Sequence, residues 1–297
     1  MSKVIVSCCV TCMNRGEQLS KTLEKNLELI AEFDGAAEIC LVNFIKDKEG
    51  ENVDQWVRSI GPRPGFKYFV TRDLSAWHAS IAKNTAHLQG EGIILLNLDC
   101  DNFLSRSAID ALVRLDESTL SRTVFSAFTG GLVEEFTKHK TLLGRARGLV
   151  KYGLSLLAKQ KSGFNIKVKP VLIRSRRGGI DNDFNGTYGQ IGLGRDVFRF
   201  VSGYDESFPP MGGQDKDILW RAYNCGGVHF LHIPQEREEL PILNSKEESL
   251  KNTKQAGESW EAMQEIGTLK SLNAVRDRRI VANLGKKNIG VPVERVF

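Results

Sequence analysis

The sequence has 297 residues, of which 41% are hydrophobic and 26% charged, a composition typical of a globular protein with a large core. No stretch approaches the roughly 18 apolar residues that a membrane-spanning helix needs, and the N-terminus is more typical of a first strand than of a signal peptide. Of the six cysteines, Cys9 and Cys12 form half of a zinc or redox motif that no second pair completes. Because several cysteines fall in expected strands, we expect buried thiols in a cytoplasmic protein.

The net charge of +5 is unevenly distributed along the chain. Residues 136–180 contain twelve Lys or Arg and no Asp or Glu, so the rest of the chain is net acidic. Leu142, Leu149 and Leu157 fall on one helical stripe of this segment, with basic residues at other positions. This pattern predicts a basic amphipathic helix that binds an anionic membrane surface through residues 138–177, peripheral to the membrane. The alternative is a packed helix with a solvated basic face. No nucleic-acid partner is expected, because no aromatic stacking pattern accompanies the charge.

Hydrophobic periodicity predicts strands that alternate with helices through the first 122 residues. The expected strands are 3–10, 37–44, 66–71 and 93–98, and the expected helices are 16–33, 77–88 and 105–115, with a charged loop at 46–51. This alternation is typical of βαβ units. It predicts an α/β fold with a right-handed, doubly wound, mainly parallel sheet.

The pattern changes after Arg122. The sequence predicts a strand at 123–128, the basic segment, a Gly-rich loop at 178–194 interrupted at 188–193, turns at 195–208, a helix at 218–224 and a strand at 228–233. Polar helical runs from 246 to 283 predict a helical C-terminal appendage.

Two acids, Asp99 and Asp101, follow the apolar run at 93–96, where the chain leaves the sheet. In an open α/β sheet, ligands bind outside the carboxyl ends of the strands. Two neighbouring carboxylates repel each other unless a cation neutralises them, and Mg²⁺ or Mn²⁺ takes carboxylate and phosphate oxygens together. The pair therefore predicts a metal-assisted site for a phosphorylated substrate, with a solvated turn as the alternative.

A second motif, Gly212-Gly213-Gln214-Asp215, precedes the expected helix at 218–224. A glycine pair lets the backbone approach a ligand closely. An acid near the start of a helix is favoured in its ionised form, which suits a general base. The alternative is that Asp215 only caps the helix.

Segments 97–102, 194–198 and 203–217 together resemble, in order and spacing, family 2 glycosyltransferases of the GT-A fold. The second half is similar to the C-terminal region of galactosyltransferases and polypeptide N-acetylgalactosaminyltransferases. The resemblance runs from about residue 3 to residue 235. It implies a metal-dependent, inverting transfer of a hexose or N-acetylhexosamine from a nucleotide sugar, a UDP-sugar, to a hydroxyl of a glycan or lipid-linked glycan in polysaccharide or lipopolysaccharide synthesis.

The resemblance also implies how the chain is divided. Residues 1–240 would form the GT-A domain, followed by a helical extension at 241–297. Within the domain, 1–122 would be the nucleotide-sugar-binding half, 123–180 a basic, partly helical insertion, and 181–240 the acceptor and catalytic half.

The resemblance assigns a metal site to the acids after the fourth strand. Asp101 would coordinate Mn²⁺ or Mg²⁺ bridging the diphosphate, and Asp99 would face the ribose or the water shell of the metal. A histidine in a late strand is a further ligand in this fold. His229 and His232 lie three residues apart and so point to opposite faces of a strand. His232 fits the family position better, with a packed strand histidine as the alternative.

The resemblance assigns the acceptor site to the second motif. Asp215 would deprotonate the acceptor hydroxyl, and Gly212, Gly213 and Gln214 would bind the acceptor. Gln214 departs from the more common Glu-Asp pattern and cannot serve as the base, although it can hydrogen-bond a sugar hydroxyl.

The donor side is expected at the ends of the early elements. A strand-to-helix turn presents free amides, and an arginine can bind a phosphate through two parallel hydrogen bonds. The expected donor-binding residues are Thr11, Asn14, Arg15, Asn43, Asp47, Lys83, Asn84 and Asp99. Lys83 and Asn84 lie in a stretch that begins at Trp77 and resembles another donor-side segment of the family, and ordinary surface polar residues are the alternative there.

Two other functions share parts of this pattern. A sugar nucleotidyltransferase also uses a doubly wound sheet and a metal-bound Asp, but it needs a Gly-rich, basic loop after the first strand, where residues 8–17 contain only Gly16. A non-catalytic glycan-binding relative is the other alternative.

Overall fold

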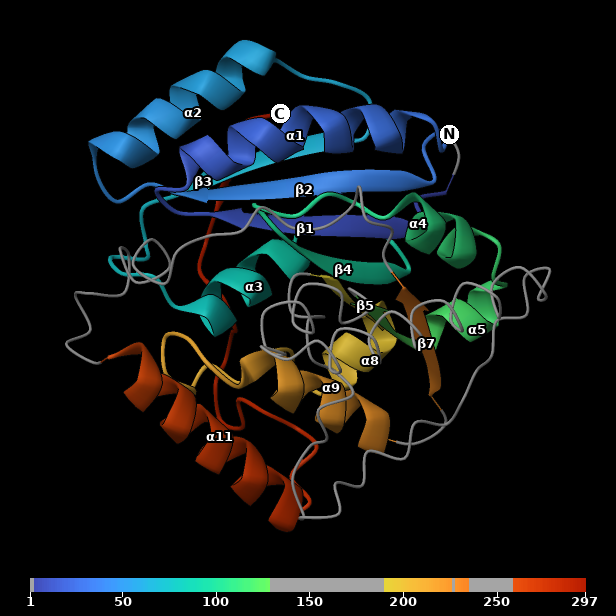
Figure 1. Ribbon diagram of the computed structural model, residues 1–297, viewed down its shortest axis with the longest axis vertical. Helices are drawn as coiled ribbons and strands as arrows, with labels where there is room; N and C mark the ends of the chain where they lie inside the picture. Colours follow the sequence, from blue (N-terminus) through green and yellow to red (C-terminus); the bar gives the residue numbers. More distant parts are fainter. Residues whose placement is uncertain (1–2, 129–189, 226–227, 235–258) are drawn as a thin grey trace, which may run out of the picture.

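The computed structural model describes residues 3–128, 190–225, 228–234 and 259–297. The described residues contain an eight-stranded sheet of order β7-β5-β6-β4-β1-β2-β3-β8 (Figure 1). The basic segment at 138–177 lies outside the described residues, so its membrane-binding role stays a prediction. No helix in the described ranges is long and apolar enough to cross a membrane.

The first half of the chain forms four parallel strands. They are β1 (Val6–Cys12), β2 (Ala37–Phe44), β3 (Phe66–Thr71) and β4 (Ile94–Asp99). The register places Thr11 beside Asp99 and Cys12 beside Asn43, so the carboxyl ends of the parallel strands β1, β2 and β4 lie side by side. The site described below lies at these strand ends.

Helices cover both faces of the sheet (Figure 1). The helices α1 (Gly16–Ala31), α2 (Lys48–Ile60) and α4 (Arg106–Val113) bury one face, with Leu23, Val53 and Ile109 in the core. The helices α3 (Ala79–His87), α8 (Arg195–Phe200) and α9 (Gln214–Asn224) bury the other face, with Ala82 and Ile218 in a second core. The expected doubly wound, mainly parallel α/β fold is confirmed.

The second half adds strands of mixed direction. After the short helix α5 (Glu117–Ser121) come β5 (Thr123–Phe128), β6 (Gln190–Gly194) and β7 (His229–Pro234). Strand β6 is antiparallel to both β4 and β5, whereas β7 is parallel to β5. Gly192 of β6 lets Phe125 pack closely, because an added Cβ would lie 3.2 Å from the Cβ of Phe125.

Two local predictions were wrong. Residues 46–51 are not a loop, because α2 begins at Lys48 and the carboxylate of Asp47 accepts the backbone N–H of Glu49 and Gly50 as its N-cap. Its buried face has just two fully buried hydrophobic residues, Val53 and Val57, and the many charged residues around them hid the helical pattern in the sequence. Residues 195–208 are not turns alone, since α8 begins at Arg195.

The C-terminal residues contain the helix α11 (Trp260–Arg276) and a strand that the sequence did not predict, β8 (Glu294–Arg295). Strand β8 pairs antiparallel with β3, and the backbone N–H of Tyr68 donates to the carbonyl oxygen of Phe297 at 3.0 Å. The ring of Phe297 lies 5.3 Å from that of Phe66. The last residues thus close the edge of the sheet beside β3.

Candidate functional site

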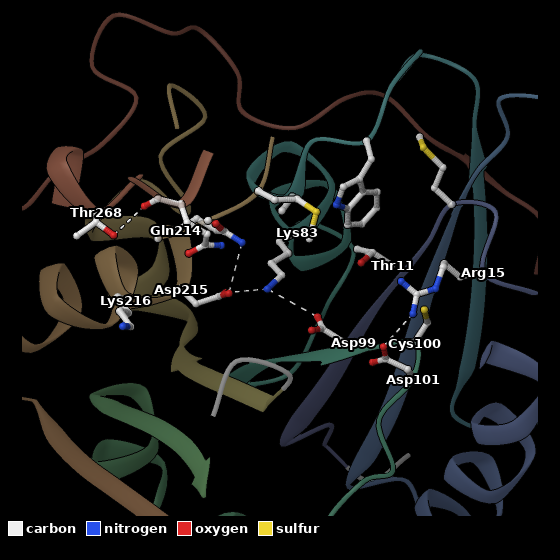
Figure 2. Close-up of a pocket in the computed structure, with 17 residues that line it drawn as sticks. Thr11, Arg15, Lys83, Asp99, Cys100, Asp101, Gln214, Asp215, Lys216 and Thr268 are labelled. Atoms are coloured by element: carbon white, nitrogen blue, oxygen red, sulfur yellow. Dashed lines mark hydrogen bonds and ion pairs between the residues drawn. The ribbon is translucent and has the colours of Figure 1, made fainter. Parts of the chain in front are cut away.

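A pocket of about 460 Å³ opens at the carboxyl ends of β1 and β4 (Figure 2). Its walls come from these strand ends, from α3, from the loop that leads into α9, and from α11. Predicted site residues that line it are Thr11, Arg15, Lys83, Asp99, Asp101, Gly212, Gly213, Gln214 and Asp215. In Figure 2, Arg15 and Asp101 lie on one side, Asp215, Gln214 and Thr268 on the other, and Lys83 lies between them.

The first side of the pocket contains the two acids that end β4. The guanidinium of Arg15 lies 3.1 Å from Asp101, whose other oxygen accepts the amide of Asn102 at 2.8 Å. The amide of Asn97 donates to Asp99 at 3.0 Å. Burial and the charge of Asp99 raise the pKa of Asp101 above its usual value, against the opposing effect of Arg15. The two carboxylates therefore repel each other on this side of the pocket.

These residues fit a hard divalent cation. Carboxylate oxygens are the donors that Mg²⁺ and Mn²⁺ prefer, and a bound cation would offset both the burial and the charge of Asp99 that raise the pKa of Asp101. Among the described side chains, no three His, Cys, Asp or Glu are grouped so that they could hold a metal. The two carboxylates would thus need further oxygen ligands from a substrate or from water.

The histidine expected at the metal, His232, has a side chain outside the described part of the structure. His232 of β7 pairs through its backbone with Ser126 of β5. His229 lies at the start of the same strand, is exposed, and does not line the pocket.

Lys83 links the two sides of the pocket. Its ammonium lies 2.7 Å from Asp215 and 3.7 Å from Asp99, and it lies over the ring of Tyr204 at 5.5 Å from the centroid. Burial lowers the pKa of Lys83, but the charges of Asp215 and Asp99 more than offset it and raise the pKa above its ordinary value. The lysine is buried and charged, held between an acid of each motif.

Asp215 is placed by the glycine pair before it. Gly212 and Gly213 have φ values of +105° and +79°, a backbone conformation that favours glycine. Gly213 is the N-cap of α9 and no side chain caps the helix, so Asp215 is not a capping residue. Its carboxylate contacts Lys83 and, at 3.4 Å, the amide of Gln214. Burial raises the pKa of Asp215, and Lys83 opposes this.

A buried ion pair supports the same helix from behind. Arg221 of α9 is fully buried, with its guanidinium 2.7 Å from Asp217. Arg221 also donates to the carbonyl oxygens of Val201 and Gly203. It therefore ties α9 to the segment that leads into the glycine pair, and Asp217 is occupied in this support.

Four expected donor-binding residues do not line the pocket. The amide of Asn14 donates to Asp47 at 2.8 Å, and Asp47 caps α2. Asn43 is buried and donates to the carbonyl of Gly50. Asn84 is also buried and exchanges hydrogen bonds with the backbone of Tyr204. Each is engaged in holding the fold together, as expected of structural polar residues.

The pocket also includes residues that the sequence did not single out. Gln264 and Thr268 come from α11, about fifty positions beyond the glycine pair. The one sequence signal for them is Gly267, a glycine inside a helical run, which often marks a close packing contact. Met13, Met211 and Lys216 likewise line the pocket.

No protein-family model matches the sequence, and no curated protein matches it. The structure is similar to the mannosyltransferase PcManGT from Pyrobaculum calidifontis in complex with GDP-Man and Mn²⁺, with a TM-score of 0.52 and 11% identity over 94% of this chain and 75% of that one. It is also similar to GalNAc-T7 with UDP, GalNAc and Mn²⁺, with a TM-score of 0.51 and 13% identity over 93% of this chain and 48% of that chain. At these identities the likeness shows the fold alone, which is of GT-A type.

Proposed function

We propose that the protein is a metal-dependent glycosyltransferase that transfers a sugar from a nucleotide-sugar donor to a hydroxyl of an acceptor. The observation that carries the proposal is the pocket with a carboxylate pair on one side, Asp99 and Asp101, and a single buried carboxylate, Asp215, on the other. The first arrangement suits a cation with a diphosphate, and the second suits proton removal from an acceptor. The GT-A fold is consistent with this division of the pocket.

The proposed reaction is a direct displacement with inversion at the anomeric carbon. Asp215 takes the proton of the acceptor hydroxyl, the acceptor oxygen forms a bond to the anomeric carbon, and the bond from that carbon to the diphosphate breaks. The diphosphate leaves with the electron pair. When bound, the cation supplies charge neutralisation of this leaving group. Arg15 lines the same side of the pocket and adds a fixed positive charge there, which suits a phosphate.

Lys83 has a separate part in this proposal. Its charge favours the ionised form of Asp215, which burial alone would disfavour. A carboxylate that is ionised yet poorly hydrated is a better base than one in water. Lys83 also faces Asp99, so it fixes the base relative to the metal side.

For the donor we propose a UDP-linked hexose or N-acetylhexosamine, in keeping with the resemblance to family 2 enzymes. The two similar structures contain GDP-Man and UDP with GalNAc, respectively, both with Mn²⁺. UDP- and GDP-sugars should therefore both be tested, with Mn²⁺ and with Mg²⁺.

For the acceptor we propose a glycan or a lipid-linked glycan, reached at an anionic membrane surface through the basic segment at 138–177. The support is the charge of that segment, where twelve basic and no acidic residues fall between 136 and 180. Each basic residue near an anionic leaflet adds about 1 kcal/mol of attraction. Co-sedimentation with anionic vesicles at low salt, reversed by added salt, tests this, and its absence refutes it.

The experiment that tests the proposal is an assay of UDP- and GDP-sugars for release of the nucleoside diphosphate in the presence of Mn²⁺. We expect slow hydrolysis of one donor by the wild type, dependent on the metal and lost in Asp101→Ala. Release of pyrophosphate from a nucleoside triphosphate and a sugar phosphate would instead indicate a nucleotidyltransferase. Donor binding without any release would indicate a non-catalytic relative.

A further inference from the structure

Helix α11 packs against the glycine pair through a glycine of its own. A Cβ added to Gly267 would lie 2.2 Å from the carbonyl oxygen of Gly212, and one added to Gly213 would lie 2.8 Å from the backbone of Gly267. Real side chains do not tolerate such distances, so the two backbones touch only because all three residues are glycines. The glycine pair that positions Asp215 therefore also positions α11.

Further contacts fix the same helix along the loop before α9. The ammonium of Lys270 donates to the carbonyl oxygen of Ser207 and lies 5.6 Å from the ring centroid of Phe208. One residue further on, the hydroxyl of Ser271 donates to the carbonyl oxygen of Gly213 at 3.4 Å. Helix α11 is thus held at several points to the segment that ends at the candidate base.

This docking directs two polar side chains of α11 into the pocket. Gln264 and Thr268 are four residues apart, on one face of the helix, and both line the pocket. The hydroxyl of Thr268 donates to the backbone carbonyl of Gln264 at 2.7 Å (Figure 2). The hydroxyl oxygen of Thr268 can therefore still accept a hydrogen bond from a ligand. Within the described residues, the side-chain amide of Gln264 makes no hydrogen bond.

A third polar group on this side lacks a partner. Gln214 is 7% exposed, and its side-chain oxygen is buried without a hydrogen-bond partner among the described residues. Its nitrogen is 3.4 Å from Asp215, so the oxygen is the atom that remains to be satisfied. A buried acceptor atom of this kind is costly unless a ligand or water pairs with it.

We infer that α11 forms the outer wall of the acceptor subsite, where Gln264 and Thr268, together with Gln214, bind the hydroxyl groups of a neutral saccharide beside Asp215. The inference rests on the proposed function and names its acceptor class. An amide and a hydroxyl can each pair with a sugar hydroxyl, which is both donor and acceptor. Lys216 lines the same side, so an anionic sugar is the rival occupant.

The test is steady-state transfer from the donor that the wild type hydrolyses to p-nitrophenyl glycosides of glucose, galactose, mannose, N-acetylglucosamine and glucuronic acid. Thr268→Val and Gln264→Leu keep the side-chain size and remove hydrogen-bonding groups. We expect each to raise the acceptor KM about 5- to 10-fold, the loss typical of one hydrogen bond, with the donor KM shifted less than about 2-fold. Thr268→Ser, which keeps the hydroxyl, should restore the acceptor KM. Glu265→Gln is the matched control, because Glu265 is exposed on α11 and does not line the pocket.

The outcomes separate this inference from the proposed function. If the wild type releases no nucleoside diphosphate from any donor, the proposed function fails and the inference fails with it. If the wild type uses a donor but accepts no neutral glycoside, or prefers the glucuronide, the acceptor class is wrong. If transfer occurs but Thr268→Val and Gln264→Leu keep the wild-type acceptor KM, or change the donor KM instead, α11 is not the acceptor wall.

Discussion

Replacement of Lys83 by Met should destabilise the protein strongly, because it leaves Asp215 buried without its cation. At the observed 2.7 Å between Lys83 and Asp215, the attraction is about 6 kcal/mol for an effective dielectric constant of about 20. Desolvation offsets much of this attraction, and breaking a buried pair from one side typically costs about 3–5 kcal/mol. Asp99, which is partly exposed, adds less. Urea unfolding monitored by circular dichroism measures the loss.

The loss should depend on pH in a defined direction. Without Lys83, burial raises the pKa of Asp215 further above its unfolded value. A group whose folded pKa is raised stabilises the fold below its unfolded pKa, and that contribution is lost as the pH rises through the folded value. The loss of stability caused by Lys83→Met should thus be smallest near pH 4 and larger at neutral pH.

Two controls make the reasoning refutable. Lys83→Met combined with Asp215→Asn should recover most of the loss, because the buried charge is gone. Lys21→Met removes an exposed partner of Glu17 and should leave the unfolding free energy unchanged within error. A Lys83→Met variant as stable as Lys21→Met, or a double variant no more stable than the single one, would refute the argument.

Three further predictions follow from the site. Asp101→Ala should weaken the calorimetric binding of Mn²⁺ with UDP or GDP by at least about 10-fold, and unchanged binding would remove Asp101 from the metal site. Gly267→Ala should lower the melting temperature, although Ala normally favours a helix over Gly by up to about 1 kcal/mol; a higher melting temperature would contradict the docking of α11. His232→Ala should raise the Mn²⁺ concentration needed for half-maximal activity, whereas His229→Ala should not, and the reverse ranking would mean that the other face of β7 meets the metal.

Elements with a strong hydrophobic signal could be predicted from the sequence. Strands β2, β3 and β5 begin and end where the sequence predicts, because runs such as 37–44 are both apolar and rich in β-forming residues. Helix α2 could not, because Val53 and Val57 are its only fully buried hydrophobic residues and most of its other residues are charged or polar. Strand β8 is set by tertiary pairing with β3, which no local pattern records.

The site was predictable in the same uneven way. Asp99, Asp101 and Asp215 each follow a local signal, a strand end or a glycine pair, and the structure places all three at one pocket. Asn43, Asp47 and Asn84 follow similar signals, yet they hydrogen-bond to backbone groups of a turn, a helix N-terminus and a buried loop. Polar residues near strand ends can either bind ligands or satisfy the backbone in this way, and the local sequence does not distinguish the two. Gln264 and Thr268 reach the pocket through the long-range packing of α11, in which Gly267 contacts the glycine pair and Lys270 and Ser271 hold the same helix to the loop before α9.

The measurement that tests the central claim most directly compares Asp215→Asn with the wild type at saturating donor and Mn²⁺. The substitution keeps the size and position of the side chain but removes its ability to take a proton. We predict that kcat for transfer falls by at least about 100-fold, the usual contribution of a general base, while the Kd of the donor changes less than about 3-fold. Transfer by Asp215→Asn at near the wild-type rate would contradict the assignment of the base and the account of the pocket built on it.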